Sequence, residues 1–200
     1  NIAPCLIVSD KLEFAAYTIR PKIHKALIEF MDEFPSLIKM SKSVISPDKI
    51  DWIEIQKSFK INFDVQEIDW LKPGEGAAQK TFNHFLKNKF ENYHDLRNDP
   101  TKDYQSNLSP YIHFGQISAQ RISLDTEKYD GNPESKKVFL EELIVRRELS
   151  DNFCYFNKNY DSFDGFHDWA KTTLNEHRKD EREFTYTLKQ FEHAKTHEEL

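Results

Sequence analysis

The sequence predicts a mainly α-helical protein that begins with a short strand and a helix. Two observations support this fold class. Apolar residues recur at helical spacing through much of residues 71–200, and no strand pattern appears after Trp70. Residues 5–8, CLIV, instead form a short and wholly apolar run that is typical of a buried strand. Because one strand cannot form a sheet, we expect either another partner strand or an α/β domain cut off before Asn1.

The first helix is expected over residues 13–34. Its apolar face is formed by Ile23, Leu27, Phe30 and Phe34. Pro21 interrupts this pattern. Since proline lacks an amide donor and crowds the preceding turn, the helix is expected to be either kinked or split in two at this position.

Residues 35–70 are mixed in composition and prone to turns, and we interpret them as a linker with one short helix. A helix-start signal, Ser46-Pro47-Asp48, lies in this segment. It precedes three apolar residues at helical spacing: Trp52, Ile55 and Phe59.

A helix of about seven turns is expected next, with Pro73 at its first position and its end at residues 98–100, NDP. Its repeating face comprises Ala78, Phe82, Phe85, Leu86, Phe90, Tyr93 and Arg97. Further helices are predicted over residues 118–128, 135–156 and 168–178, and a last one after Thr187.

The start of the last helix has the pattern of a capping box. Thr187 can accept a hydrogen bond from the amide three residues on, and the side chain of Gln190 can reach back. Tyr186 can pack against Phe191 as a hydrophobic staple. Such a box contributes about 1 kcal/mol. The helix is expected to run to Glu199 without a stop signal, so we expect the chain to be truncated at its end as well as at its start.

Other motifs with known chemistry are weak. His193 and His197 share a face of the last predicted helix at metal-ligand spacing, but no third ligand accompanies them, so a solvated pair is favoured and no metal is expected. The five glycines form neither a dinucleotide fingerprint nor a P-loop. Cys5 and Cys154 match no metal or redox spacing, and no disulfide is expected.

Composition narrows the function classes. A net charge of −6 argues against a protein that coats nucleic acid nonspecifically, although a local basic face remains compatible with it. Aromatic residues make up 14% of the chain, enough to form a buried core. No run approaches the roughly 18 apolar residues that span a bilayer, and the start lacks the features of a signal peptide. We therefore expect a soluble intracellular protein, cytoplasmic or nuclear.

The most informative stretch is residues 106–118, SNLSPYIHFGQIS. Ser109 followed by Pro110 is a strong helix start, and Ser106 and Asn107 add polar groups beside the free amides of the first turn. A helix N-terminus of this kind favours a phosphate or pyrophosphate. From spacing alone, an ordinary helix cap is the more frequent explanation.

This stretch closely resembles the flavin-diphosphate segment of the photolyase and cryptochrome family. Residues 141–154, EELIVRRELSDNFC, look like the class II cyclobutane pyrimidine dimer photolyases in particular. Further similar strings are TIRPKIHK (18–25), WLKPGE (70–75), RNDPTKD (97–103), DWAK (168–171) and HRKD (177–180). The likeness covers nearly the whole chain.

The resemblance implies a particular domain organisation. Residues 1–34 would be the C-terminal remnant of an α/β antenna domain, with a βα unit, and residues 35–70 the linker. Residues 71–200 would be the N-terminal part of the helical FAD-binding domain. By that implication the chain is less than half of a family member, and we expect weak or absent flavin in it, because the family encloses FAD with further helices.

The resemblance also assigns site residues. It places FAD contacts on Tyr93, Gln105, Ser106, Asn107, Leu108 and Ser109. It places DNA contacts on Arg97 and on the helix 142–149, with Glu142, Arg146, Arg147 and Leu149. Glu142 would be the catalytic residue, hydrogen-bonded to the carbonyl edge of the flipped dimer. An aromatic residue that some class members carry near the following turn is replaced here by Arg146 and Arg147.

The residues themselves allow simpler roles. Tyr93 can be a core aromatic, and Arg97 can be a solvated group or a partner of the helix C-terminus. Glu142 and Arg146 are four apart and can form an exposed intrahelical ion pair worth about 0.3–0.5 kcal/mol.

The activity implied by the resemblance is light-driven repair of cyclobutane pyrimidine dimers in DNA by a monomeric deoxyribodipyrimidine photo-lyase. The lesion leaves the base stack, and reduced FAD passes one electron to it. Two alternatives remain open: a cryptochrome-like flavin light receptor without repair activity, and a cofactor-free helical interaction module.

Overall fold

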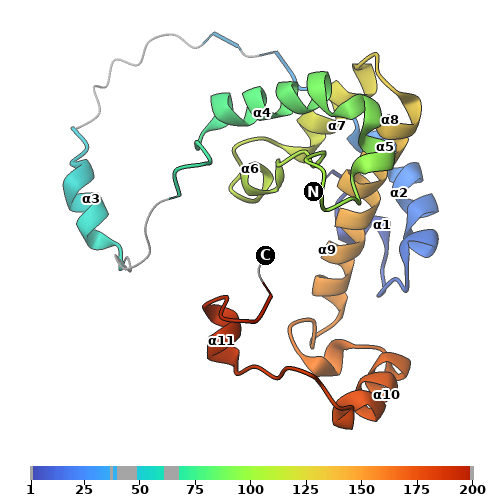
Figure 1. Cartoon of the computed structure of the whole chain (residues 1–200). Helices are drawn as coiled ribbons and strands as arrows, with labels where there is room; N and C mark the ends of the chain where they lie inside the picture. Colours follow the sequence, from blue (N-terminus) through green and yellow to red (C-terminus); the bar gives the residue numbers. More distant parts are fainter. Residues whose placement is uncertain (1, 37, 40–48, 61–67, 199–200) are drawn as a thin grey trace. The chain divides into compact units, whose positions relative to one another are not determined.

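The computed structural model describes residues 2–36, 38–39, 49–60 and 68–198, and every regular element in these ranges is a helix (Figure 1). The mainly α-helical fold class is therefore confirmed. The chain divides into two compact units, Asn1–Asn152 and Phe153–Leu200, which we describe separately. The predicted boundaries near residues 34 and 70 stay predictions, because compactness does not assign a segment to a parent domain.

The strand predicted at residues 5–8 is wrong, because the segment is the helix α1 (Cys5–Val8). The amides of Ile7 and Val8 donate hydrogen bonds to the Pro4 carbonyl at 2.9 and 3.1 Å, so the segment forms a helical turn. Val8 is buried but Ile7 is 62% exposed. A short apolar run has no periodicity that separates a strand from a helical turn, which explains the error.

The helix α2 (Ala16–Phe30) is shorter than predicted and runs without a break through Pro21. Ile19 and Ile23 on its inner face are fully buried. The expected apolar face continues to Leu27 and Phe30, which pack against the core. Phe34 lies beyond the helix, with the Arg121 guanidinium 4.1 Å from its ring centroid.

The short helix predicted in the linker is present as α3 (Trp52–Ser58). The Asp51 side chain caps it, accepting hydrogen bonds from the amides of Ile53 and Glu54 at 2.9 and 3.0 Å. The Ser46-Pro47-Asp48 signal lies outside the described residues.

The prediction of a single long helix beginning at Pro73 is wrong, because the segment is interrupted twice. It is divided into α4 (Glu75–Asn88), the 3-10 turn η1 (Phe90–Asn92) and α5 (Tyr93–Leu96). Gly74 precedes α4 with a φ of 103°, and the breaks fall at Lys89 and Asn92. The predicted apolar face is nevertheless buried throughout: Ala78, Phe82, Phe85, Leu86, Phe90 and Tyr93.

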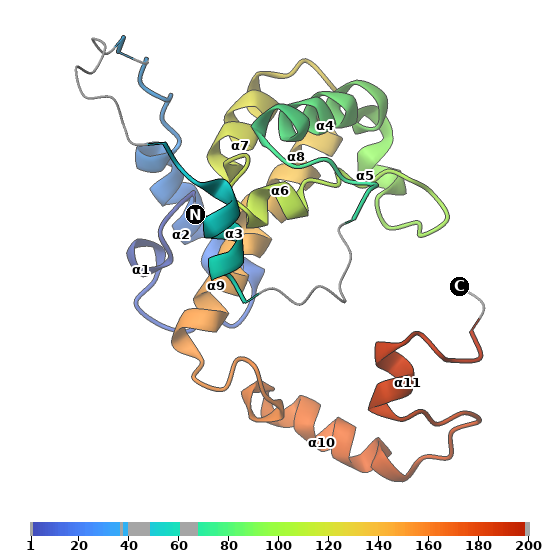
Figure 2. The same cartoon turned by 90° about the vertical axis from the view of Figure 1, so that its left-hand side faces the viewer.

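The remaining helices of the first unit follow the sequence pattern more closely. They are α6 (Ser109–His113), α7 (Ala119–Lys128), α8 (Pro133–Leu140), the π-helical turn η2 (Glu141–Arg146) and α9 (Arg147–Phe156), within which the first unit ends. The helix predicted over residues 118–128 is present, and the Ser118 hydroxyl caps it by accepting a hydrogen bond from the Arg121 amide at 3.0 Å. The predicted helix 135–156 begins two residues earlier and contains the π turn. The two views show α8 beside α5 and α7 (Figures 1 and 2).

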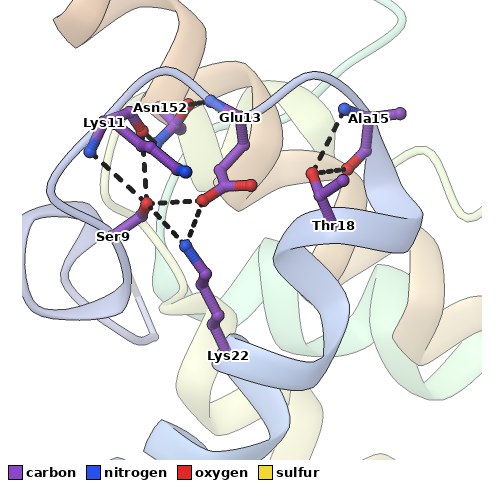
Figure 3. Close-up of polar contacts among 7 residues, drawn as sticks. All are labelled: Ser9, Lys11, Glu13, Ala15, Thr18, Lys22 and Asn152. Carbon is purple, nitrogen blue, oxygen red and sulfur yellow. Dashed lines mark hydrogen bonds and ion pairs between the residues drawn. The ribbon is translucent and has the colours of Figure 1, made fainter.

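Buried polar side chains fasten the N-terminal segment to α9. Asn152 accepts a hydrogen bond from the Glu13 amide at 2.8 Å and donates to the Lys11 carbonyl at 3.0 Å (Figure 3). The Glu13 carboxylate in turn bonds to Ser9 at 2.6 Å and pairs with Lys22. Burial alone would raise the pKa of Glu13, but hydrogen bonds from Lys22, Ser9 and Thr18 outweigh it and lower that pKa to about 2.

The second unit contains η3 (Phe163–Gly165), α10 (Asp168–Glu176), η4 (His177–Lys179) and α11 (Leu188–Glu192). The predicted capping box is confirmed, since the Thr187 hydroxyl accepts from the Gln190 amide at 3.3 Å and the Thr187 amide donates to Gln190 at 2.8 Å. The rings of the predicted staple, Tyr186 and Phe191, lie 5.4 Å apart.

The predicted extension of the last helix to Glu199 is wrong. The helix ends at Glu192, and Ala194 turns the chain with a φ of 50°. His193 and His197 therefore do not share a helix face, and the His197 ring stacks on Phe184 at 3.6 Å. Among the described residues, no group of three potential ligands could hold a metal ion.

Candidate functional site

A cavity of about 730 Å³ lies in the first unit, within the usual size range of small-molecule sites. Three separate segments form its wall: α5 with the two residues after it, the loop leading into α6 together with α6 itself, and the helix from the end of α8 through η2 to the start of α9. The lining residues are Tyr93, Arg97, Asn98, Gln105, Ser106, Leu108, Ser109, Ile112, His113, Phe139, Glu142, Leu143 and Arg147.

Packed aromatic rings support one side of the cavity. The Tyr93 ring meets Phe85 and Phe139 edge to face, with centroids 5.3 and 5.5 Å apart. Burial raises the pKa of Tyr93; Arg97 opposes this rise and Glu142 adds to it. The phenol is therefore neutral at physiological pH and can donate a hydrogen bond. Tyr93 serves both the core and the cavity wall, so the two roles considered for it are compatible.

The loop before α6 is held by its own contacts. The Lys89 ammonium lies 2.6 Å from the Asp103 carboxylate and 3.3 Å from the Gln105 carbonyl. The Gln105 amide donates to the Arg97 carbonyl. Asn107 has a φ of 57°, a left-handed conformation that asparagine tolerates better than most residues. Asn107 does not line the cavity, but it turns the chain between residues that do.

The predicted helix start is present, but the ordinary helix cap considered for it does not form: Ser109 is the first residue of α6, Leu108 holds the cap position, and no side chain caps the helix. Ser106 and Ser109 both line the cavity. Leu108 is 1% exposed, so it is chiefly a core residue. Because α6 has only five residues, the helix dipole is small, and the hydroxyl groups are the stronger polar feature of this wall.

The opposite wall contains the π turn, and this turn changes the ion pairs expected from the sequence. In a π turn residues i and i+5 come together. Arg146 accordingly lies 3.8 Å from Glu141, and the predicted pair with Glu142 does not form. Glu142 instead faces the cavity and lies 3.4 Å from the Arg97 guanidinium. The two residues are 45 positions apart, so spacing along the helix could not reveal this pair.

Two arginines border the cavity with unused donors. Arg97 Nε and Arg147 Nη1 are buried and have no hydrogen-bond partner among the described residues. A buried donor without a partner costs about 1–3 kcal/mol. A ligand with acceptor atoms, in particular an anionic one, would recover that cost.

The structure thus brings eight of the eleven predicted site residues around one cavity: Tyr93, Arg97, Gln105, Ser106, Leu108, Ser109, Glu142 and Arg147. Three do not line it. Asn107 shapes the loop, Arg146 turns to Glu141, and Leu149 packs against the core. Five further residues line the cavity that were not among the predicted site residues: Asn98, Ile112, His113, Phe139 and Leu143. His113 and Ile112 lie within the SNLSPYIHFGQIS motif, which was the available signal.

The fold and the cavity together define a helical protein with a polar cavity bordered by arginines, whose unpartnered nitrogens can donate to acceptor groups. No family model matches the chain. The whole chain is 44% identical to a deoxyribodipyrimidine photo-lyase of Potorous tridactylus and 43% identical to one of Oryza sativa subsp. japonica, and it spans 38% and 41% of these proteins. A photo-lyase of Methanothermobacter thermautotrophicus is 38% identical over 98% of the chain, which spans 43% of it.

The chain belongs to the deoxyribodipyrimidine photo-lyase family. The chain spans about two fifths of the length of these relatives. None of the helices in the described ranges combines the length and the apolar character needed to cross a lipid bilayer.

Proposed function

We propose that this chain forms one part of the flavin and lesion site of a class II cyclobutane pyrimidine dimer photolyase. The observation that carries the proposal is the cavity itself, because it gathers hydroxyl groups, an aromatic phenol, arginine donors and the Glu142 carboxyl from three segments. The photo-lyase relatives support the activity, and the reaction would be light-driven repair of UV-damaged DNA.

The residues present fit a flavin dinucleotide. FAD has an aromatic ring system and a diphosphate, and the cavity offers a counterpart for each. Ser106, Ser109 and Gln105 would hydrogen-bond its polar groups, and Tyr93 would donate from a rigid ring position. The buried, unpartnered nitrogens of Arg97 and Arg147 would remain available for acceptor oxygens of the DNA. When bound, FAD supplies the light-driven one-electron transfer, while the protein supplies position and electrostatics.

Glu142 would act on the lesion side. A carboxyl group stabilises negative charge on a pyrimidine carbonyl only if it carries a proton or is linked to another donor. Arg97 lies within reach of Glu142 and can provide that donor. Arg97 would then have two roles: it would contact a phosphate or a base of the DNA, and it would orient Glu142. Arg147 would add a second positive group at the same wall.

Repair activity is tested in a polypeptide of photo-lyase length that contains this sequence. Under blue or near-ultraviolet light the unsubstituted polypeptide should repair dimer-containing DNA. Glu142→Gln should lower the yield of repair per absorbed photon. The substitution Glu134→Gln, at an exposed position outside the cavity, is the matched control. Flavin binding without any repair would favour a light receptor and contradict the proposal.

The 200-residue chain itself tests the flavin part. We expect it to bind FAD weakly, because only part of the binding wall is supplied by its cavity. Titration with FAD followed by flavin fluorescence should give weak binding that falls further in the double variant Ser106→Ala/Ser109→Ala. Stoichiometric FAD on the purified chain would contradict the expectation of weak binding, and binding unaffected by both serine substitutions would contradict the site.

A further inference from the structure

The π turn separates two adjacent carboxylates and gives each a different partner. Glu141 and Glu142 begin the turn, yet Glu141 pairs with groups outside the cavity while Glu142 lines it. In an α-helix, Arg146 would face Glu142 at the i, i+4 spacing. The extra residue of the π turn moves Arg146 to Glu141 and leaves Glu142 free to meet Arg97.

Arg20 of α2 is the principal partner of Glu141. Its Nη2 lies 2.6 Å from Glu141 Oε1 and its Nε lies 3.0 Å from Oε2, so the two groups meet through two parallel hydrogen bonds. This bidentate geometry fixes the carboxylate in orientation as well as in position. The residues are 121 positions apart, and α2 packs against η2, so the contact joins the N-terminal segment to the cavity wall.

We propose that Arg20 is a positioning residue for Glu142, an inference that rests on the proposed function of the cavity. By occupying both oxygens of Glu141, Arg20 holds the first residue of the π turn and leaves Arg146 as a secondary partner on the outer side. Glu142 is thereby directed to Arg97 and the cavity. Glu141, which was not among the predicted site residues, thereby supports the position of Glu142.

The electrostatic surroundings agree with this role. The hydrogen bond from Arg20 is the main cause of the lowered pKa of Glu141, and burial opposes it. Glu141 therefore remains ionised and paired at neutral pH. Charged or titratable groups that line the cavity with Glu142 are Tyr93, Arg97, His113 and Arg147. Arg20 acts on this set only through Glu141.

The test uses nuclear magnetic resonance of the 200-residue chain, with the Arg97 Nε–H signal as the reporter. Glu142→Gln sets the size of the signal change when the pair with Arg97 is lost. Arg20→Met should shift the Arg97 signal by at least half of that change, and Glu141→Gln should shift it in the same direction. Arg20→Lys, which keeps the charge but not the two parallel bonds, should give an intermediate shift.

The control is Lys128→Met, which removes the Lys128–Glu33 ion pair elsewhere in the same unit and should leave the Arg97 signal in place. The double variant Arg20→Glu/Glu141→Arg, in which the two charges are exchanged, should return the Arg97 signal to its original position. A lowered melting temperature with an unmoved Arg97 signal in both Arg20→Met and Glu141→Gln would show that Arg20 only stabilises the fold and would overturn the proposal. Neither flavin nor DNA enters this measurement, so its failure is distinct from failure of the proposed function.

Discussion

The carboxylate of Glu148 accepts a hydrogen bond from the backbone amide of Ile2 at 3.0 Å, joining residues 146 positions apart. Glu148 is fully buried, and its other oxygen has no partner among the described residues. Burial raises the pKa of Glu148, and the hydrogen bond from Ile2 opposes that rise only in part. The contact therefore ties the start of the first unit to α9 at an electrostatic cost.

This cost predicts a pH-dependent effect of Glu148→Gln. Glutamine keeps an acceptor for the Ile2 amide and removes the buried charge. Because the folded pKa of Glu148 is raised, its stabilising contribution is present at low pH and is lost as the pH rises through that pKa. Relative to the unsubstituted chain, Glu148→Gln should gain stability in urea unfolding as the pH rises above the ordinary carboxyl pKa, and the gain should level off once the pH exceeds the raised pKa of Glu148. Glu134→Gln, at an exposed position, should show no such trend.

Glu13 predicts the opposite dependence. Its pKa is lowered from 4.5 to about 2, so its contribution is present above about pH 4.5 and is lost as the pH falls toward 2. Glu13→Gln should cost at most about 3 kcal/mol at pH 7, and the difference from the parent should vanish near pH 2. The exposed Glu29 on α2 is the control, and Glu29→Gln should follow the parent at every pH. A constant difference for Glu13→Gln would contradict the ion pair with Lys22.

Two glycines should respond oppositely to alanine. A Cβ at Gly165 would clash with the backbone carbonyl oxygen of Asn159, so Gly165→Ala must displace backbone and should destabilise the second unit. A Cβ at Gly76 in α4 meets nothing within 4 Å, and Gly76→Ala should stabilise that helix by about 0.8–1 kcal/mol. Residue-resolved hydrogen exchange measures the stability of the second unit and of α4 separately, so each substitution can be assessed in its own unit. Equal effects of the two substitutions would contradict the packing at Gly165.

Lys89 is expected to control the order of the cavity loop. Lys89→Met removes its bonds to the Asp103 carboxylate and the Gln105 carbonyl while keeping a long side chain. Amide exchange in residues 99–108 should increase several-fold, because the loop loses two anchors to the end of α4. Lys87→Met, at an exposed neighbouring position on α4, should leave that exchange unchanged. Unchanged exchange in Lys89→Met would mean that Gln105 and Asn107 hold the loop without it.

The apolar rhythm of residues 78–93 identified the buried face correctly although the long helix is broken. The irregular residues Lys89 and Asn92 adjust the chain without turning Phe90 or Tyr93 out of the core. The capping residues Ser118 and Thr187 were predictable for a different reason, because their hydrogen bonds involve neighbours in the chain. Local chemistry therefore fixed these two helix starts.

Features that depend on distant partners were not predictable. Nothing in the run 141–146 distinguishes a π turn from an α-helix, so the pairing of Glu142 with Arg97 could not be derived from the sequence. The apolar segment 5–8 resembled a strand because four apolar residues are too few to show either a helical or a strand periodicity. The family resemblance predicted most of the residues of the cavity wall, whereas the contact between Arg20 and Glu141 joins residues too distant in the chain to be predicted.

The π turn also constrains how this region can change in evolution. Removing one residue between Glu141 and Arg146 would restore an ordinary helix and rotate everything after it by about 100° relative to what precedes. Arg147 would leave the cavity and Glu148 would leave the amide of Ile2 in the same step. Insertions and deletions should therefore be tolerated far less here than in surface loops, because one deletion would change the cavity wall and the buried contact of Glu148 together.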